Sequence, residues 1–81
     1  MTKNEFDTKY QSEGLFEELV LHGVYDRMRN TVMPDLLEKI NKAPKQGKRR
    51  AKYVESYNKC ASIVNDINAV LGRKTRYGIL N

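Results

Sequence analysis

The residues best suited to chemistry in this 81-residue chain are cations. Residues 42–52 contain six basic side chains and no acidic one: Lys42, Lys45, Lys48, Arg49, Arg50 and Lys52. Such a cluster can neutralise phosphates and release their counterions, which is how proteins bind nucleic-acid backbones. It would also fit an acidic protein surface, and a solvated turn without any ligand is the third interpretation. The net charge of +5 points to the same classes of partner.

Two tyrosines and a second basic group extend this candidate site. Tyr53 follows the cluster and could stack on unpaired bases, whereas Tyr57 falls on an apolar seam and is expected to be buried. The second basic group lies near the end of the sequence and consists of Arg73, Lys74 and Arg76. We predict that the six cations, Tyr53 and this second group bind nucleic acid. RNA or a single strand is favoured, because the sequence has no helix-turn-helix, homeodomain, zinc-finger, RRM or KH pattern.

Catalytic and metal chemistry find little support in the sequence. His22 and Cys60 are the single histidine and the single cysteine, and they are too few for a structural zinc site. Neither has an evident catalytic partner, so we expect no catalytic residue, no cofactor and no enzyme activity. One cysteine also rules out an internal disulfide, which favours a reducing compartment. With no apolar run of membrane-spanning length and no signal-peptide pattern, the expected location is cytoplasmic, away from membranes.

The elements that must position the cations are predicted to be helices in one small all-α domain, residues 1–81. Thr2 and Glu5 match a capping box, which predicts a short N-terminal helix. A second helix is expected over about 13–42, with Ser12 as its N-cap. Apolar residues recur in it at helical spacing: Leu15, Phe16, Leu19, Val20, Val24, Met28, Val32, Leu36, Leu37 and Ile40. Pro34 predicts a break or kink near 30–34, either inside one long helix or between two.

The second half of the chain is predicted to be a basic turn, a long helix and a tail. The turn spans 42–47 and contains Pro44 and Gly47. The helix, over 48–71, carries a heptad-like seam formed by Val54, Tyr57, Ala61, Val64, Ile67 and Leu71. Gly72 is the expected stop. The basic and apolar tail, 73–81, presents Tyr77, Ile79 and Leu80, which would dock either on the core or on a partner.

Packing the two long helices as an antiparallel hairpin predicts where the charges lie. A turn near residue 45 would place Ile40 beside Ala51 and Leu19 beside Leu71. The second basic group would then lie close to three acidic residues, Glu13, Glu17 and Glu18, which would partly neutralise it. The basic turn would have no acidic neighbours and would be the dominant positive surface of the molecule.

These observations predict a small nucleic-acid-binding protein, not an enzyme, which acts as an inhibitor or modulator of a larger macromolecule. One alternative is an inhibitor or adaptor that binds an acidic protein surface without nucleic acid, using the tail residues Tyr77, Ile79 and Leu80 as anchors. Another is a structural protein that forms homo-oligomers through its apolar seam.

The sequence also resembles a class of small viral proteins. Its acidic start (Asn4, Glu5, Phe6, Asp7), basic middle (Lys45 to Lys52) and Tyr-rich helical body are similar in character to the accessory proteins of tailed bacteriophages. Proteins of that class take over host functions or counter host defence by binding a host macromolecule. The resemblance therefore implies a host protein or protein complex as partner and the host cytoplasm as location, and it assigns no role to an individual residue.

Overall fold

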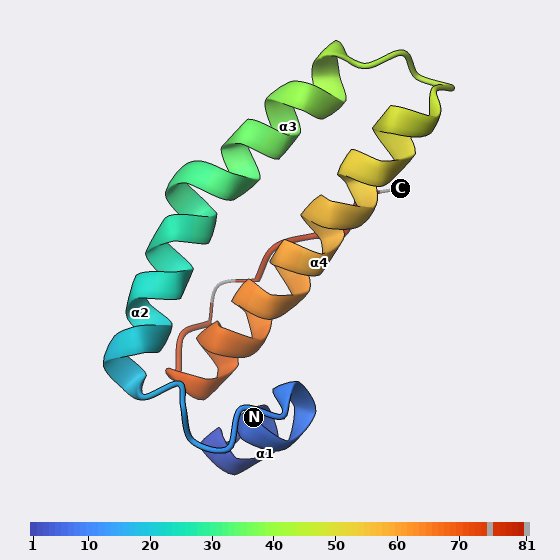
Figure 1. The fold of residues 1–81 in the computed structure, drawn as a ribbon. Helices are drawn as coiled ribbons and strands as arrows, with labels where there is room; N and C mark the ends of the chain where they lie inside the picture. The colour runs from blue at the N-terminus through green and yellow to red at the C-terminus, as the bar shows by residue number, and fades with distance from the viewer. Residues whose placement is uncertain (75, 81) are drawn as a thin grey trace.

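The chain folds as an antiparallel helical hairpin, which confirms the predicted all-α class. The computed structural model describes residues 1–74 and 76–80. Its elements are α1 (Lys3–Tyr10), α2 (Glu18–Arg27), the π-helical turn η1 (Met28–Val32), α3 (Met33–Lys42) and α4 (Lys48–Val70). Figure 1 shows α2 and α3 joined as one rod beside α4, with α1 across the open end of the hairpin. The molecule measures 40 × 21 × 21 Å.

The predicted capping box begins α1. The backbone N–H of Glu5 donates to Thr2 Oγ1 at 3.1 Å, and the N–H of Thr2 donates to Glu5 Oε1 at 3.2 Å. Phe6 is the buried residue of this helix. Asp66 of α4 holds the other end of α1, because its carboxylate accepts from Lys9 Nζ at 2.7 Å and from Tyr10 Oη at 2.5 Å. The short helix is thus fixed to α4 by charge and to the core by the rings of Phe6 and Tyr10.

The second helix begins at Glu18, so the prediction of a start near residue 13 was wrong. Gln11 and Glu13 have φ values of 53° and 50°, in the left-handed region, and a right-handed helix cannot pass through them. Ser12 is not an N-cap. Its buried hydroxyl donates to Asp7 Oδ1 at 2.8 Å and ties the loop to α1.

The apolar stripe predicted for this helix was wrong at four positions, which are exposed: Leu15, Leu19, Val20 and Leu37. Other members pack against the core as predicted: Phe16, Val24, Met28 and Leu36. Leu15 and Leu19 are 77% and 83% exposed, whereas Leu21 and Tyr25 are buried. The predicted contact of Leu19 with Leu71 is replaced by one in which Leu21 and Leu71 line a common small cavity. The core face of α2 is therefore rotated relative to the face that the sequence periodicity indicates.

The π-helical turn accounts for this rotation. Met33 donates its N–H to the carbonyl of Met28, five residues back, so this turn contains one residue more than an α-helical turn. Tyr25 and Met33 are both buried although eight residues separate them, where two α-helical turns would need about seven. The same wide turn precedes Pro34, which lacks a backbone donor and would crowd an α-helical turn. At the predicted break, the chain passes from α2 to α3 without leaving the helical path.

The predicted seam of α4 is confirmed. Tyr57, Ala61, Val64 and Ile67 are buried in the core, and Val54 and Leu71 pack at its two ends. The helix ends as predicted at Gly72, which has φ of 76° and lets Arg73 N–H donate to the carbonyl of Asn68 at 2.8 Å.

The tail after α4 docks on the protein's own core, which decides between the two alternatives left open by the sequence. It turns back along α4 (Figure 1) and is held there by the side chains of Asn65 and Asn58. Tyr77 and Leu80 pack against the core, whereas Ile79 is 58% exposed. Positions 75 and 81 of the predicted tail 73–81 lie outside the described residues.

Candidate functional site

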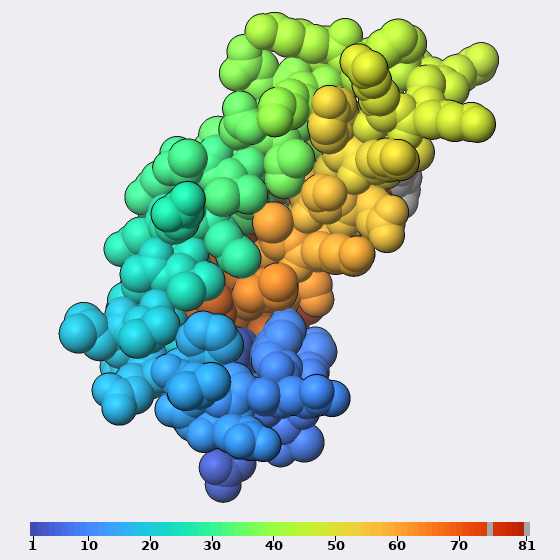
Figure 2. Space-filling view, in the orientation of Figure 1, coloured from blue at the N-terminus to red at the C-terminus, as the bar shows by residue number. Residues whose placement is uncertain are grey.

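The six cations of residues 42–52 gather at the closed end of the hairpin, and we call this set the basic end. Lys42 is the last residue of α3 and Lys48 the first of α4. Between them, Gly47 N–H donates to the Pro44 carbonyl at 3.1 Å and closes the connection. Figure 2 shows the side chains of the segment around residue 45 extending away from the body of the molecule.

Most of the positive charge at the basic end is not compensated by ion pairs. Lys42 Nζ lies 2.7 Å from Glu38 Oε1, so the prediction that the whole turn lacks acidic neighbours was wrong for this residue. The other five cations of the basic end have no ion pair among the described residues. By contrast, Lys3, Lys9, Lys39 and Lys59 each pair with an aspartate or glutamate elsewhere in the molecule. Five further cations in the described part of the chain also form no ion pair, and they are spread over α2, η1 and the residues after α4: Arg27, Arg29, Arg73, Lys74 and Arg76. Residues 45–52 therefore hold the largest single group of unpaired cations.

The start of α4 adds a positive electrostatic contribution to the basic end. Its N-cap is Gly47, no side chain caps it, and no acidic residue lies in its first turn. The first backbone N–H groups of a helix carry a partial positive charge and favour anions. Cations at this position repel the helix dipole, and a bound phosphate would relieve that repulsion.

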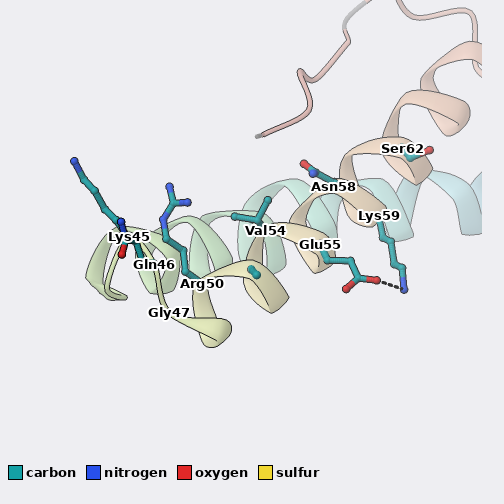
Figure 3. A pocket seen from close by; sticks show the side chains of 10 residues that line it. Lys45, Gln46, Gly47, Arg50, Val54, Glu55, Asn58, Lys59 and Ser62 are labelled. Carbon is teal, nitrogen blue, oxygen red and sulfur yellow. Dashed lines mark ion pairs between the residues drawn. The ribbon is translucent and has the colours of Figure 1, made fainter.

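A shallow groove runs from the basic end along α4 (Figure 3). Its volume is about 690 Å³, and Ala51 and Val54 supply apolar lining. Lys45 and Arg50 lie at the basic end of the groove, and Asn58 lies farther along the helix. On the rim, Lys59 Nζ is 3.5 Å from Glu55 Oε1, and both side chains are exposed. The groove is open to solvent and combines an apolar surface with a net positive rim.

The two tyrosines predicted beside the cluster differ in position. Tyr57 is buried, as predicted. Tyr53 is half-buried against the core, and Lys39 Nζ lies 5.9 Å from the centre of its ring. Since one side of the Tyr53 ring already faces protein and a cation lies over the ring, it offers little free surface for stacking on a base.

The second basic group is not part of the basic end. Arg73, Lys74 and Arg76 follow the opposite end of α4, a helix of 23 residues and therefore about 34 Å long. Arg73 Nη2 is 2.9 Å from His22 Nδ1, and its guanidinium carbon is 4.6 Å from the centre of the Tyr25 ring. Within the described part of the chain, none of the three forms an ion pair with Glu13, Glu17 or Glu18, and the nearest approach to these acids runs through His22, which lies 3.8 Å from Glu18 Oε1. One short anionic ligand cannot contact both groups at once.

His22 and Cys60, the two residues with catalytic potential, lie in surroundings that the structure describes. His22 lies 3.8 Å from Glu18 Oε1, in addition to its contact with Arg73. Cys60 is half-buried, and burial raises the pKa of its thiol, which disfavours the nucleophilic thiolate. Among the described residues, no three His, Cys, Asp or Glu side chains come close enough to hold a metal ion. None of the helices described here combines the length and the apolar character needed to span a membrane.

Two sets of residues at the surface were missed by sequence reasoning. Asn58 and Asn65 hold the tail, and their spacing of seven residues on α4 was the available signal. The exposed side chains at the start of α2 were assigned to the core because they match a helical period. These three residues, Leu15, Leu19 and Val20, lie within six positions of the sequence that also contain Glu17 and Glu18, and we call them the exposed patch.

Comparison of the chain with protein-family models, with curated proteins and with solved structures gave no significant match.

Proposed function

We propose that the protein binds nucleic acid through the basic end, with RNA or another single strand favoured over a specific duplex. The observation that carries the proposal is the set of five cations without an ion pair at the end of the hairpin, next to an uncapped helix start. A phosphate backbone would supply the missing counter-charge and release its own counterions. A flexible strand can follow the small turn between α3 and α4, and the proposal requires no element that enters a duplex groove.

The salt dependence of binding tests this proposal. Affinity for a labelled oligouridine is measured by fluorescence anisotropy over a range of KCl concentrations. If all five unpaired cations contact phosphates, the slope of log affinity against log salt is about −3.5 for a single strand. A slope near zero would refute binding through these cations.

A pair of charge-matched variants separates a local effect from one of net charge. Replacing Arg49 with Glu removes one cation of the basic end, and replacing Arg27 with Glu removes one exposed cation outside both basic groups. The first variant is expected to make the slope shallower by about 0.7, and the second to leave it nearly unchanged. Equal effects of the two variants would contradict a localised site.

A second candidate function, a protein-binding inhibitor or adaptor, rests on the exposed patch. Leu15 and Leu19 are almost fully exposed at the end of the molecule opposite the basic end, and Val20 adjoins them. Apolar side chains exposed to this degree and close in sequence favour an interaction site. The neighbouring Glu17 and Glu18 favour a partner with a basic surface, and the phage-like character of the sequence is compatible with a host protein.

The two roles can be separated by a pull-down from lysate with and without nuclease. A partner retained after nuclease treatment and lost in the Leu19→Ser variant supports the protein-binding role. A partner lost on nuclease treatment and unaffected by Leu19→Ser supports nucleic-acid binding alone.

A further inference from the structure

The tail is held on α4 by a pattern that recognises backbone. Asn65 donates from Nδ2 to the Tyr77 carbonyl at 3.0 Å, and its Oδ1 accepts from Tyr77 N–H at 2.7 Å. Asn58 repeats this arrangement with Leu80, at 2.9 and 2.8 Å. Each asparagine amide therefore satisfies both the donor and the acceptor of one tail residue, as a neighbouring β-strand would.

The spacing of the two asparagines matches an extended chain. Seven residues along α4 span about 10.5 Å. Three residues of an extended backbone, from position 77 to position 80, span about 9.3 to 10 Å. The asparagines therefore contact every third residue of an extended segment, which runs antiparallel to α4. Because they bond to main-chain atoms, this part of the contact does not depend on the side chains of the segment.

The groove described above continues the same path along α4. Asn58 both holds Leu80 and lines the groove. One further heptad toward the start of α4 is Ala51, which lies in the apolar lining with Val54. The rim beyond it carries Lys45 and Arg50. An extended segment that follows the tail's path past Asn58 therefore enters apolar surroundings first and then reaches unpaired positive charge.

We propose that this outer face of α4 is a binding track for an extended peptide of another protein, in which apolar residues are followed by acidic ones. The protein's own tail occupies the first part of the track, and the incoming peptide replaces it and places its acidic residues between Lys45 and Arg50. A peptide is favoured over RNA because each asparagine needs a paired N–H and C=O spaced as in a polypeptide. The assignment is independent of whether the basic end binds nucleic acid.

The test uses a probe built from the segment already seen on the track. The probe is a fluorescein-labelled peptide with the sequence of residues 76–80, followed by Ala-Val to cover the apolar lining at Val54 and Ala51, and then by Asp-Glu-Asp. Its binding to the full-length chain is followed by anisotropy at constant ionic strength, without nucleic acid. The titration extends to about 1 mM, the effective concentration that a short tether gives the competing tail. A second probe ending in Asn-Gln-Asn has the same length without the acidic charge.

Substitutions on the two sides of the contact are expected to act in opposite directions. Leu80→Ala weakens the resident tail and should raise probe affinity roughly fivefold, because less of the track is blocked. Adding Asn58→Ala to that variant removes two hydrogen bonds to the probe and should lower affinity about tenfold. Asn41→Ala, at an exposed position on α3, is the matched control and should have no effect. The neutral probe should bind more weakly than the acidic one, and Arg50→Glu should abolish that preference.

Three outcomes would overturn the proposal. The first is no binding of the acidic probe to the Leu80→Ala variant at the highest concentration. The second is loss of affinity in both Leu80→Ala and Asn58→Ala, which indicates that the contact only supports the fold. The third is displacement of the probe by oligouridine together with no effect of Asn58→Ala, which assigns the groove to nucleic acid. Because no nucleic acid is present in the main titration, a negative result with the peptide does not bear on nucleic-acid binding by the basic end, which the salt dependence tests separately.

Discussion

Replacing Asp66 with Asn should destabilise the protein by removing the charge that fixes α1 to α4. The Asp66 side chain is 16% exposed and accepts hydrogen bonds from Lys9 and Tyr10. Making the acceptor neutral costs about 1 kcal/mol in the half-buried bond from Tyr10. The bond from Lys9, whose side chain is 50% exposed, adds about 0.5 kcal/mol after screening by solvent. The expected loss is about 1.5 kcal/mol of unfolding free energy, or roughly 6–12 °C in Tm for a domain of this size.

The effect should depend on pH with a definite sign. Burial alone raises the pKa of Asp66, but the hydrogen bonds from Lys9 and Tyr10 outweigh it and hold the pKa below its usual value. A carboxylate whose pKa is lowered by folding stabilises the native state above its unfolded pKa of about 3.9, and this contribution is lost as pH falls through the folded pKa. The wild type and Asp66→Asn should therefore differ most near neutral pH and converge in acid.

Urea unfolding followed by circular dichroism, near neutral pH and at about pH 2.5, checks both expectations. Asp35→Asn is the matched control, because Asp35 pairs with Lys39 at 3.1 Å but is 57% exposed, and it should change stability by less than about 0.5 kcal/mol. The reasoning is refuted if the two variants lose the same stability at neutral pH, or if the Asp66→Asn deficit persists unchanged in acid.

Three further predictions follow from the structure. Leu21→Ala should lower the free energy of unfolding by about 2–4 kcal/mol, because Leu21 is buried, whereas Leu19→Ala should lower it by less than about 0.5 kcal/mol. Urea unfolding measures both, and equal losses would contradict the burial of Leu21 in the core face of α2. Glu38→Gln frees Lys42 and should steepen the salt slope of oligouridine binding by about 0.7, while Glu13→Gln at the other end should not change it. Cys60 should react with iodoacetamide more slowly in the native protein than in denaturant at neutral pH, since burial raises its thiol pKa, and equal rates would contradict that burial.

The elements that depend on local patterns were predictable from the sequence. The seam of α4 repeats with little interruption over the buried residues Tyr57, Ala61, Val64 and Ile67, so its period alone identifies the core face. The capping box at Thr2 and Glu5 and the stop at Gly72 are local signals as well, and the structure confirms them. The basic end was visible as a run of cations because a hairpin turn keeps neighbours in sequence close in space.

Features that depend on tertiary arrangement were not predictable in the same way. The separation of Arg73 from the basic end follows from the predicted hairpin, but its contacts with His22 and with the Tyr25 ring depend on how the chain continues after α4. The role of Asn58 and Asn65 required knowing that the tail turns back along α4. The burial of Leu21 instead of Leu19 required a π-helical turn, for which no sequence pattern was recognised.

The π-helical turn between α2 and α3 has a consequence for how the length of this chain can vary. It accommodates one residue more than an α-helix would need between the buried Tyr25 and Met33. Shortening the chain by one residue among 29–31 would bring these two side chains to the seven-residue spacing of a regular helix, with both halves of the core preserved. Pro34 would then require replacement, because its ring fits the wide turn but not the narrow one. The extra residue and the proline are therefore coupled, and homologous chains are expected to have both or neither.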